Sequence, residues 1–443
     1  MIITLLLILT ILFFAIEIQK HFHIPSPISL IVLSYLFYFA FPNHKLFSED
    51  EFAELELFLI PILITSDALE LKLNDLKRNF WSLLFLAVFA VVLSIVAGYL
   101  ITDTLFGEYH LSTGAIIALF AMVLATDPVS VVSVFSNFKV PHKLKILAEG
   151  ESLFNDATAL IIFSFIALPM MQGESVGGVD IAVISLKVIS ISVLIGFLVG
   201  LIGIFLMQQT QDHMSELLLI LITAYLSFEI SEHFHVSGLL SVIVAVITLN
   251  HITEKSLKQA QRDIRRKRSS PIKQKSFLNT ITNLTKKFKK DITTIDRHEQ
   301  NLDYIRVLSL LANALLFISM ASIVDIELLY RYQYEIFMMF VVTTLIRALI
   351  MAKFSIISNS FKTMTDINFR WWSVLLFSGI KGGLSIVMLT LLPDNFEHKE
   401  MFEAIVVGVI LLSTFVYAIS LVLIITKYKR VFEKEYELEH HKE

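Results

Sequence analysis

The sequence of 443 residues contains no cysteine, so disulfide bonds and thiolate metal sites are excluded. Charged residues are also scarce. They make up 17% of the chain, whereas a soluble domain has about 25%. A phosphate-binding glycine loop and a dinucleotide-binding fingerprint are both missing, so neither ATP nor NAD is implied and we expect no cofactor. The sequence does not predict an enzyme.

Apolar residues make up 56% of the chain, and long hydrophobic stretches recur from one end to the other. A stretch of about 20 apolar residues is long enough to cross the bilayer core as a helix. We therefore predict an all-α polytopic membrane protein. Hydropathy gives about 13 candidate transmembrane helices, at residues 2–19, 25–42, 53–70, 80–101, 111–137, 145–169, 179–207, 214–233, 236–250, 304–328, 333–356, 370–392 and 400–426.

Basic residues are distributed unequally between the predicted loops. If the N-terminus lies outside, the outer loops contain only Lys45, Arg331 and Lys399, and the inner loops contain nearly all the other lysines and arginines. An excess of Lys and Arg marks cytoplasmic loops. We therefore predict an external N-terminus, a cytoplasmic C-terminus and a location in the plasma (inner) membrane.

One long polar segment divides the predicted membrane region. It contains the basic run KQAQRDIRRKRSSP, followed by apolar residues at helical spacing with lysines between them. This pattern fits either a helix on the anionic cytoplasmic leaflet or a solvated linker helix. We expect residues 255–290 to contact anionic lipid or a regulator, and not nucleic acid. The predicted parts are an N-terminal membrane part (1–250), a basic cytoplasmic loop (251–303), a C-terminal membrane part (304–426) and a short cytoplasmic tail (427–443).

Several polar side chains lie within the predicted spans. The stretch LAEGESLFNDATALI (147–161) places Ser152 and Asp156 on one face of a helix, and Glu151 and Asn155 one turn apart beside them. Oxygen ligands of this kind suit hard cations. A charge at the centre of a membrane helix costs about 2.5–3.5 kcal/mol, so each charge should face a partner or a wet cavity. We expect Glu151 to pair with Arg347, which lies in mid-span.

Two of the predicted spans contain helix-breaking residues. Pro128 interrupts ATDPVS in the span 111–137, and three glycines interrupt GIKGG in the span 370–392. By the predicted topology the two spans run in opposite directions, as the two halves of an inverted repeat would. We expect the breaks to cross, with Lys381 compensating the carbonyl ends of the half-helices and Asp127 the amide ends.

Residues 125–163 resemble the signature of sodium/proton exchangers in the monovalent cation/proton antiporter superfamily. The similarity is to the NhaP- and NHE-like branch, where an Asn-Asp pair replaces two aspartates. Weaker similarities lie at 58–79, 236–246, 343–350 and 379–393. The resemblance implies the NhaA/NhaP-like antiporter fold, with inverted-topology repeats, two crossing broken helices and a homodimer.

The resemblance also implies roles for individual residues. Asp156 binds the cation and the proton in turn, Thr126 and Ser152 add oxygen ligands, and Asn155 occupies the neighbouring position. Two departures from the family pattern concern the same site. Lys381 stands where the family usually has arginine. Asp67 is offset by one residue from the position, near Ser66, where archaeal relatives carry a glutamate. Ser66 and Asp67 are expected at the periphery of the site.

A mechanism follows from the isolated carboxylate. A protonated acid and a cation-bound carboxylate are both neutral, whereas a bare anion in the membrane is costly. Competition between a cation and H⁺ for Asp156 would therefore couple their movements by alternating access, and a single titrating carboxylate predicts electroneutral 1:1 exchange. Na⁺ or Li⁺ is the expected cation.

Other functions stay open at this point. A K⁺/H⁺ antiporter of the same fold would use the same oxygen ligands. A cation channel is a further alternative, although a single asymmetric site argues against it. An intramembrane aspartyl protease would need a Gly-x-Gly-Asp signature, and the sequence lacks one.

Overall fold

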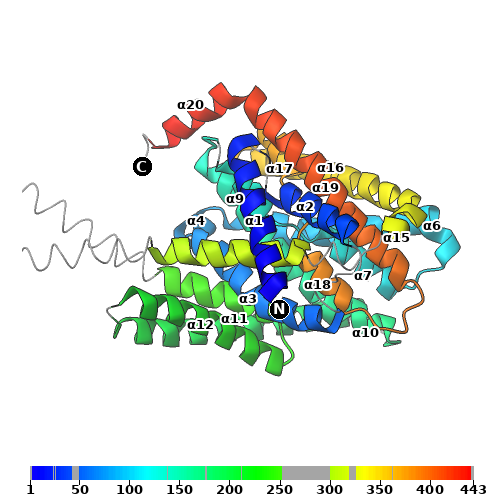
Figure 1. Ribbon diagram of the computed structural model, residues 1–443, viewed down its shortest axis with the longest axis horizontal. Helices are drawn as coiled ribbons and strands as arrows, with labels where there is room; N and C mark the ends of the chain where they lie inside the picture. The colour runs from blue at the N-terminus through cyan, green and yellow to red at the C-terminus, as the bar shows by residue number, and fades with distance from the viewer. Residues whose placement is uncertain are drawn as a thin grey trace, which may run out of the picture. The chain divides into compact units, whose positions relative to one another are not determined.

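A computed structural model shows the fold (Figure 1). It describes residues 2–22, 24, 26–41, 49–136, 138–174, 177–210, 212–251, 300–318, 326–361 and 363–440. Within these ranges the regular structure is helical and contains no strand. The predicted all-α class is therefore confirmed. The basic segment expected on the membrane surface falls almost entirely outside the described residues.

The first half of the chain forms helices that are each followed by a short connection. Most connections are only a few residues long, so helices that follow one another in sequence pack side by side, as α1 and α2 do. The elements are α1 (Ile2–Phe22), α2 (Ser26–Ala40), α3 (Glu49–Glu70), α4 (Leu73–Arg78), α5 (Phe80–Leu84), the π-helix Phe85–Phe89, α6 (Ala90–Phe106), the 3₁₀ turn Gly107–Tyr109, α7 (Thr113–Leu124), α8 (Pro128–Phe135), α9 (His142–Ile162), the π-helix Phe163–Ala167 and α10 (Leu168–Met171).

The second half contains the longest helices. They are α11 (Gly178–Met207), α12 (His213–His233), the helices Gly238–His251 and Gln300–Ile318, α15 (Ile326–Arg331), α16 (Gln333–Ser360), α17 (Phe369–Phe377), α18 (Leu384–Thr390), α19 (Lys399–Lys427) and α20 (Lys429–His440). The last of these was not predicted, because the acidic and basic residues of the tail show no apolar span.

Seven of the described helices are long and apolar enough to cross a membrane. Three shorter apolar helices accompany them, at Ser26–Ala40, Thr113–Leu124 and Gly238–His251. The predicted spans 111–137 and 370–392 are each divided into two short helices, as the proline and the glycines indicated. The predicted span 304–328 corresponds to Gln300–Ile318 and, beyond a gap in the described residues, to α15.

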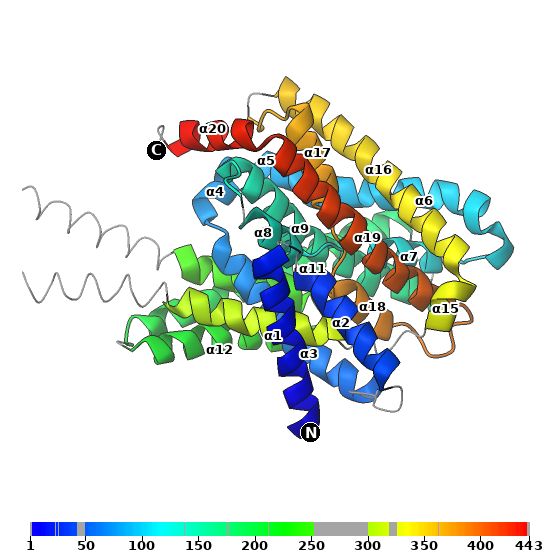
Figure 2. The same cartoon turned by 45° about the horizontal axis from the view of Figure 1, so that its top comes forward.

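The chain separates into two compact units. The first contains Met1–Ile60, Asn74–Ile189 and Leu311–Glu443, and the second contains Pro61–Leu73 and Ser190–Leu310. In the first unit α19 is the central helix, because it packs against both broken helices and α16 (Figure 2). Its residues are largely buried in the protein.

Helices of the second unit approach one another closely at glycines. A methyl group built on Gly200 of α11 would lie 2.9 Å from the carbonyl oxygen of Ala245 in the helix Gly238–His251. A methyl group on Gly203 would lie 2.6 Å from Thr223 Oγ1 of α12. Small residues allow this packing in membranes, where the hydrophobic effect does not drive helices together.

Candidate cation site at two broken helices

The first break separates α7 from α8. The helix α7 ends at Leu124, and Ala125 leaves the helical region with ψ of 141°. Pro128 then opens α8, where its missing N–H costs nothing because the first N–H groups of a helix have no intrahelical partner. The residues between the two helices, Thr126 and Asp127, are buried. The break therefore exposes polar backbone groups inside the protein.

The second break separates α17 from α18 and meets the first. The N–H of Asp127 donates to the carbonyl oxygen of Ile380 at 2.7 Å, which joins the two non-helical segments directly. Gly382 makes this contact possible, because a methyl group there would lie 2.5 Å from Asp127 Cβ. The predicted crossing of two broken helices is present.

The carbonyl end of α7 is satisfied by two side chains from other helices. The carbonyl oxygen of Leu124 accepts a hydrogen bond from Asn155 Nδ2 at 3.0 Å and another from Lys381 Nζ at 3.2 Å. Lys381 is buried, and its backbone N–H donates to Ser413 Oγ of α19 at 3.1 Å. The ammonium group thus lies at the negative end of the α7 dipole, where a cation is favoured.

Arg347 lies at the carbonyl end of the other broken helix, α17. Its Nε donates to the carbonyl oxygen of Leu376 at 3.0 Å, and its Nη2 donates to that of Leu375 at 2.9 Å. The same guanidinium pairs with Glu151 through two bonds, of 2.9 and 2.8 Å. The sequence predicted the ion pair but not the contacts with α17. Its only signal for them was a mid-span arginine, which has more donors than one carboxylate can use.

The amide end of α8 is capped by Asp127. Its Oδ2 accepts from the N–H of Ser130 at 3.1 Å and also from the Ser130 hydroxyl. A carboxylate at the first turn of a helix satisfies a free N–H and complements the dipole. The three charged residues Asp127, Arg347 and Lys381 therefore each lie at the end of a half-helix whose dipole they complement.

Asp156 lies beside this crossing. Its Oδ1 accepts from the backbone N–H of Thr126 at 2.8 Å, so the broken helix itself orients the carboxylate. The hydroxyl of Ser152 donates to Thr126 Oγ1 at 2.9 Å, and Asn155 Nδ2 lies 3.3 Å from the same oxygen. Ser152, Asn155 and Thr126 are buried, whereas Asp156 is half-buried. Four oxygen-bearing side chains predicted to act together thus lie together.

Asn155 has a further unused ligand atom. Its Oδ1 is buried and has no hydrogen-bond partner among the residues that the structure describes. Asn155 lines a cavity of about 20 Å³, together with Ser94 and the pair Glu151 and Arg347. A cavity of this size holds one water molecule. The Asn155 side chain therefore contacts Thr126 on one side and borders the cavity beside the Glu151–Arg347 pair on the other.

The charges at the crossing do not cancel. When all five groups are ionised, the three carboxylates of Asp127, Glu151 and Asp156 outnumber the two cations, Arg347 and Lys381, by one negative charge. Glu151 is matched in a bidentate pair and Asp127 caps a helix. The excess charge therefore belongs to the half-buried carboxylate, Asp156, and one monovalent cation or one proton would neutralise it.

Two predicted peripheral residues lie in the other compact unit. Ser66 is buried and Asp67 is half-buried on α3. Their part in the site stays a prediction. Among the described residues no group of three or more His, Asp or Glu side chains is arranged to hold a metal ion.

Comparison with known proteins identifies the family. Residues 5–282 match the family model described as sodium/hydrogen exchanger, transmembrane. The chain belongs to this family. The exchanger-family chain is 26% identical over 413 residues to the Na⁺/H⁺ antiporter NhaG of Bacillus atrophaeus, covering 90% of this chain and 69% of the relative. It is also 26% identical to the Na⁺/H⁺ antiporter ApNhaP of Aphanothece halophytica, covering 84% and 64%.

Solved structures support the same fold for this exchanger-family chain. The sodium proton antiporter MjNhaP1 of Methanocaldococcus jannaschii, determined at pH 8, superposes with a TM-score of 0.69 over 98% of both chains. The two sequences are only 15% identical, so this similarity concerns the fold alone. Together these findings make the chain a multi-pass membrane protein with the predicted antiporter fold.

Proposed function

We propose that the protein exchanges Na⁺ or Li⁺ for H⁺ across the membrane, with one cation moving against one proton. Asp156 binds either the cation or the proton, and alternating access of this carboxylate to the two sides couples the two movements. Thr126, Ser152 and Asn155 supply neutral oxygen ligands. The names of the antiporter relatives support the substrates.

The observation that carries this proposal is the single uncompensated charge at the crossing. Asp156 is half-buried, and it accepts the Thr126 N–H at 2.8 Å. A bare carboxylate in this position is costly, whereas the protonated acid and the ion pair with Na⁺ are neutral. Since one charge is left over, one Na⁺ or one H⁺ satisfies the site, and the exchange carries no net current.

The buried residues around Asp156 have separate tasks. Lys381 and Arg347 hold the carbonyl ends of α7 and α17, so these ends do not compete with the carboxylate for the cation. Asn155 contributes no charge, which keeps the site at one titrating group. Asp127 fixes the start of α8 beside the Thr126 N–H.

The orientation and assembly of the protein are also part of the proposal. We infer an external N-terminus, a cytoplasmic loop at 251–303 whose residues 255–290 contact anionic lipid or a regulator, and a homodimer. An impermeant maleimide added to intact cells should leave a cysteine at Glu437 unlabelled. Light scattering of the solubilised protein should give twice 50.4 kDa. Labelling of that cysteine, or a monomer mass, would contradict these inferences.

The function is tested in liposomes that contain a trapped pH dye. We expect Na⁺ or Li⁺ added to the wild-type protein to drive proton movement, and Asp156→Asn to abolish the signal because the amide neither binds a proton nor balances a cation. Glu437→Gln, a change at an exposed site on the tail, is the matched control and should retain full activity.

Three outcomes would overturn parts of this proposal. Equal signals from the wild type and Asp156→Asn would remove Asp156 from the coupling step. A response to K⁺ in place of Na⁺ and Li⁺ would identify a K⁺/H⁺ antiporter. A net current during Na⁺-driven transport, detected with a potential-sensitive dye, would exclude electroneutral 1:1 exchange.

A further inference from the structure

The C-terminal helix α20 is amphipathic and docks on the first compact unit. Phe432 is completely buried, and Glu435 and Glu439 lie one helical turn apart on a single face. Both glutamates are half-buried, whereas Glu437 is exposed. In the first two figures α20 continues directly from the end of α19 (Figures 1 and 2). The inward face of this helix therefore carries two carboxylates.

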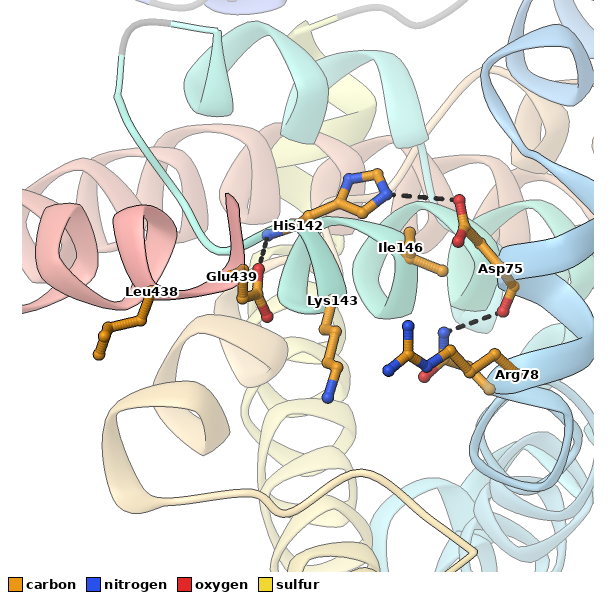
Figure 3. A pocket seen from close by; sticks show the side chains of 8 residues that line it. Asp75, Arg78, His142, Lys143, Ile146, Leu438 and Glu439 are labelled. Atoms are coloured by element: carbon orange, nitrogen blue, oxygen red, sulfur yellow. Dashed lines mark hydrogen bonds and ion pairs between the residues drawn. The ribbon is translucent and has the colours of Figure 1, made fainter. Parts of the chain in front are cut away.

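Glu439 contacts the first residue of α9. Its Oε2 accepts from the backbone N–H of His142 at 2.7 Å. The first N–H groups of a helix have no intrahelical partner, and a carboxylate there also complements the helix dipole. The side chain of His142 extends in the other direction, with Nε2 3.3 Å from Asp75 Oδ2 of α4 (Figure 3). The start of α9 is thus held between α4 and α20.

Glu435 contacts the first turn of α17. Its Oε1 pairs with Arg370 Nη2 at 2.8 Å, and its Oε2 accepts from Trp371 Nε1 at 3.0 Å. The helices that the two glutamates hold are the ones that form the candidate site, since α9 carries Asp156 and α17 leads into the second break. One helical face therefore joins the starts of both elements.

A pocket lies beneath the end of α20. It has a volume of about 160 Å³ and is lined by residues of α4, α9 and α20, among them Lys143 and Leu438 (Figure 3). The last turn of α20 therefore borders this pocket, and the Glu439 contact with His142 joins the turn to α9. Loss of that contact should release this turn.

We propose that α20 is a clamp, in which Glu435 and Glu439 act as positioning residues that fix the start of α17 relative to the start of α9. The clamp holds the Thr126 N–H and Asp156 in the arrangement that binds the cation. Glu439 and Glu435 touch no group of the candidate site, and they act through the two helices. The effect on transport rests on the proposed function, whereas the docking of α20 does not.

The docking is tested first, without any transport measurement. Because the chain lacks cysteine, the replacements Lys143→Cys and Leu438→Cys give a unique pair of spin-labelling sites across the pocket. We expect one narrow distance distribution in the otherwise unchanged protein in lipid nanodiscs, and a longer, broader one after Glu435→Gln and Glu439→Gln. Glu437→Gln is the matched control and should leave the distribution narrow. An unchanged distribution in the double variant would overturn the clamp.

Transport is tested next with the same variants. The double variant should raise the KM for Na⁺ about threefold to tenfold, as expected for the loss of helix-capping carboxylates, and should change the maximal rate less. Glu439→Asp keeps a carboxylate at this position, so it should raise the KM for Na⁺ less than Glu439→Gln does. An unchanged KM in a variant whose α20 is shown to be released would overturn the positioning role. If no variant and no wild type transports Na⁺, the proposed function fails while the distance measurement still decides the clamp.

Discussion

The crossing of the broken helices and the helix pairs of the second unit bring helices into close contact in different ways. At the crossing, the backbone is interrupted, and buried charges satisfy the free helix ends. In the second unit the helices are continuous, and glycines let backbones approach closely, as at Gly200 against Ala245. Buried charges thus satisfy the ends of the broken helices, whereas the described continuous helices of the second unit approach one another at glycines without such charges.

The difference has an energetic consequence. Removing the partner of a buried charge destabilises the protein strongly, because the charge stays desolvated and uncompensated. Adding a methyl group to a packed glycine destabilises it through steric overlap, which the helices can partly relieve by moving apart. The two regions should therefore respond differently to substitution, both in the size of the effect and in whether transport or only stability changes.

The largest effect is expected from breaking the pair of Glu151 and Arg347. Arg347→Leu removes the donors of Glu151 and of the Leu376 carbonyl group, and one of the two donors of the Leu375 carbonyl group. We therefore expect a destabilisation of about 3–5 kcal/mol or a failure to fold. Glu151→Leu leaves the arginine with its two carbonyl partners and should cost less. Thermal unfolding of the purified variants measures this order. Equal destabilisation by the two changes would contradict this order.

Replacing Glu151 and Arg347 together sharpens the same comparison. If the pair acted only as an ion pair, replacing both residues with leucine would recover most of the lost stability. Because Arg347 also binds the end of α17, we expect the stability of this double variant to stay well below that of the wild type. Full recovery would assign Arg347 to Glu151 alone.

A smaller effect is expected in the second unit from Gly196→Ala. A methyl group at this position would overlap the carbonyl oxygen of Ser241, so the variant should lose about 1–3 kcal/mol of stability. The KM for Na⁺ should not change in the folded fraction. Gly178→Ala at the start of α11 is the matched control, because nothing lies within 4 Å of a methyl group there. Equal melting temperatures for the two variants would contradict close packing at Gly196.

The smallest effect is expected from a hydrogen bond of Tyr109, a residue that lies outside the spans. Tyr109 donates to Glu335 Oε1 of α16 at 2.7 Å. Partial burial, together with the bond to the carboxylate, raises the pKa of Tyr109 above its usual 10.0. A raised pKa in the folded state means that this contribution to stability is complete below pH 10 and is lost as the pH rises further. Tyr109→Phe should therefore lower the melting temperature slightly at pH 7, and the difference should shrink above pH 10. A difference that is constant with pH would exclude this origin.

Much of the site could be predicted because membrane insertion makes polar residues conspicuous. Asp156, Arg347 and Lys381 stand out in apolar surroundings, and each needs a partner or a function. Pro128 and the glycines near 380 marked both breaks for the same reason, since backbone is interrupted at membrane depth only inside protein or beside a wet cavity.

The sequence alone determined the class of the protein and the broken spans, because hydropathy and residue type act locally. The oxygen ligands around Asp156 stay a prediction, which for Thr126 rests on the family resemblance. Only the tertiary structure decided which charge serves which helix end. It placed Arg347 at the end of α17 and Lys381 at the end of α7. It also brought Glu439 to the start of α9 across 297 positions of sequence. Such contacts depend on how helices pack, and no periodicity within one segment records the position of another.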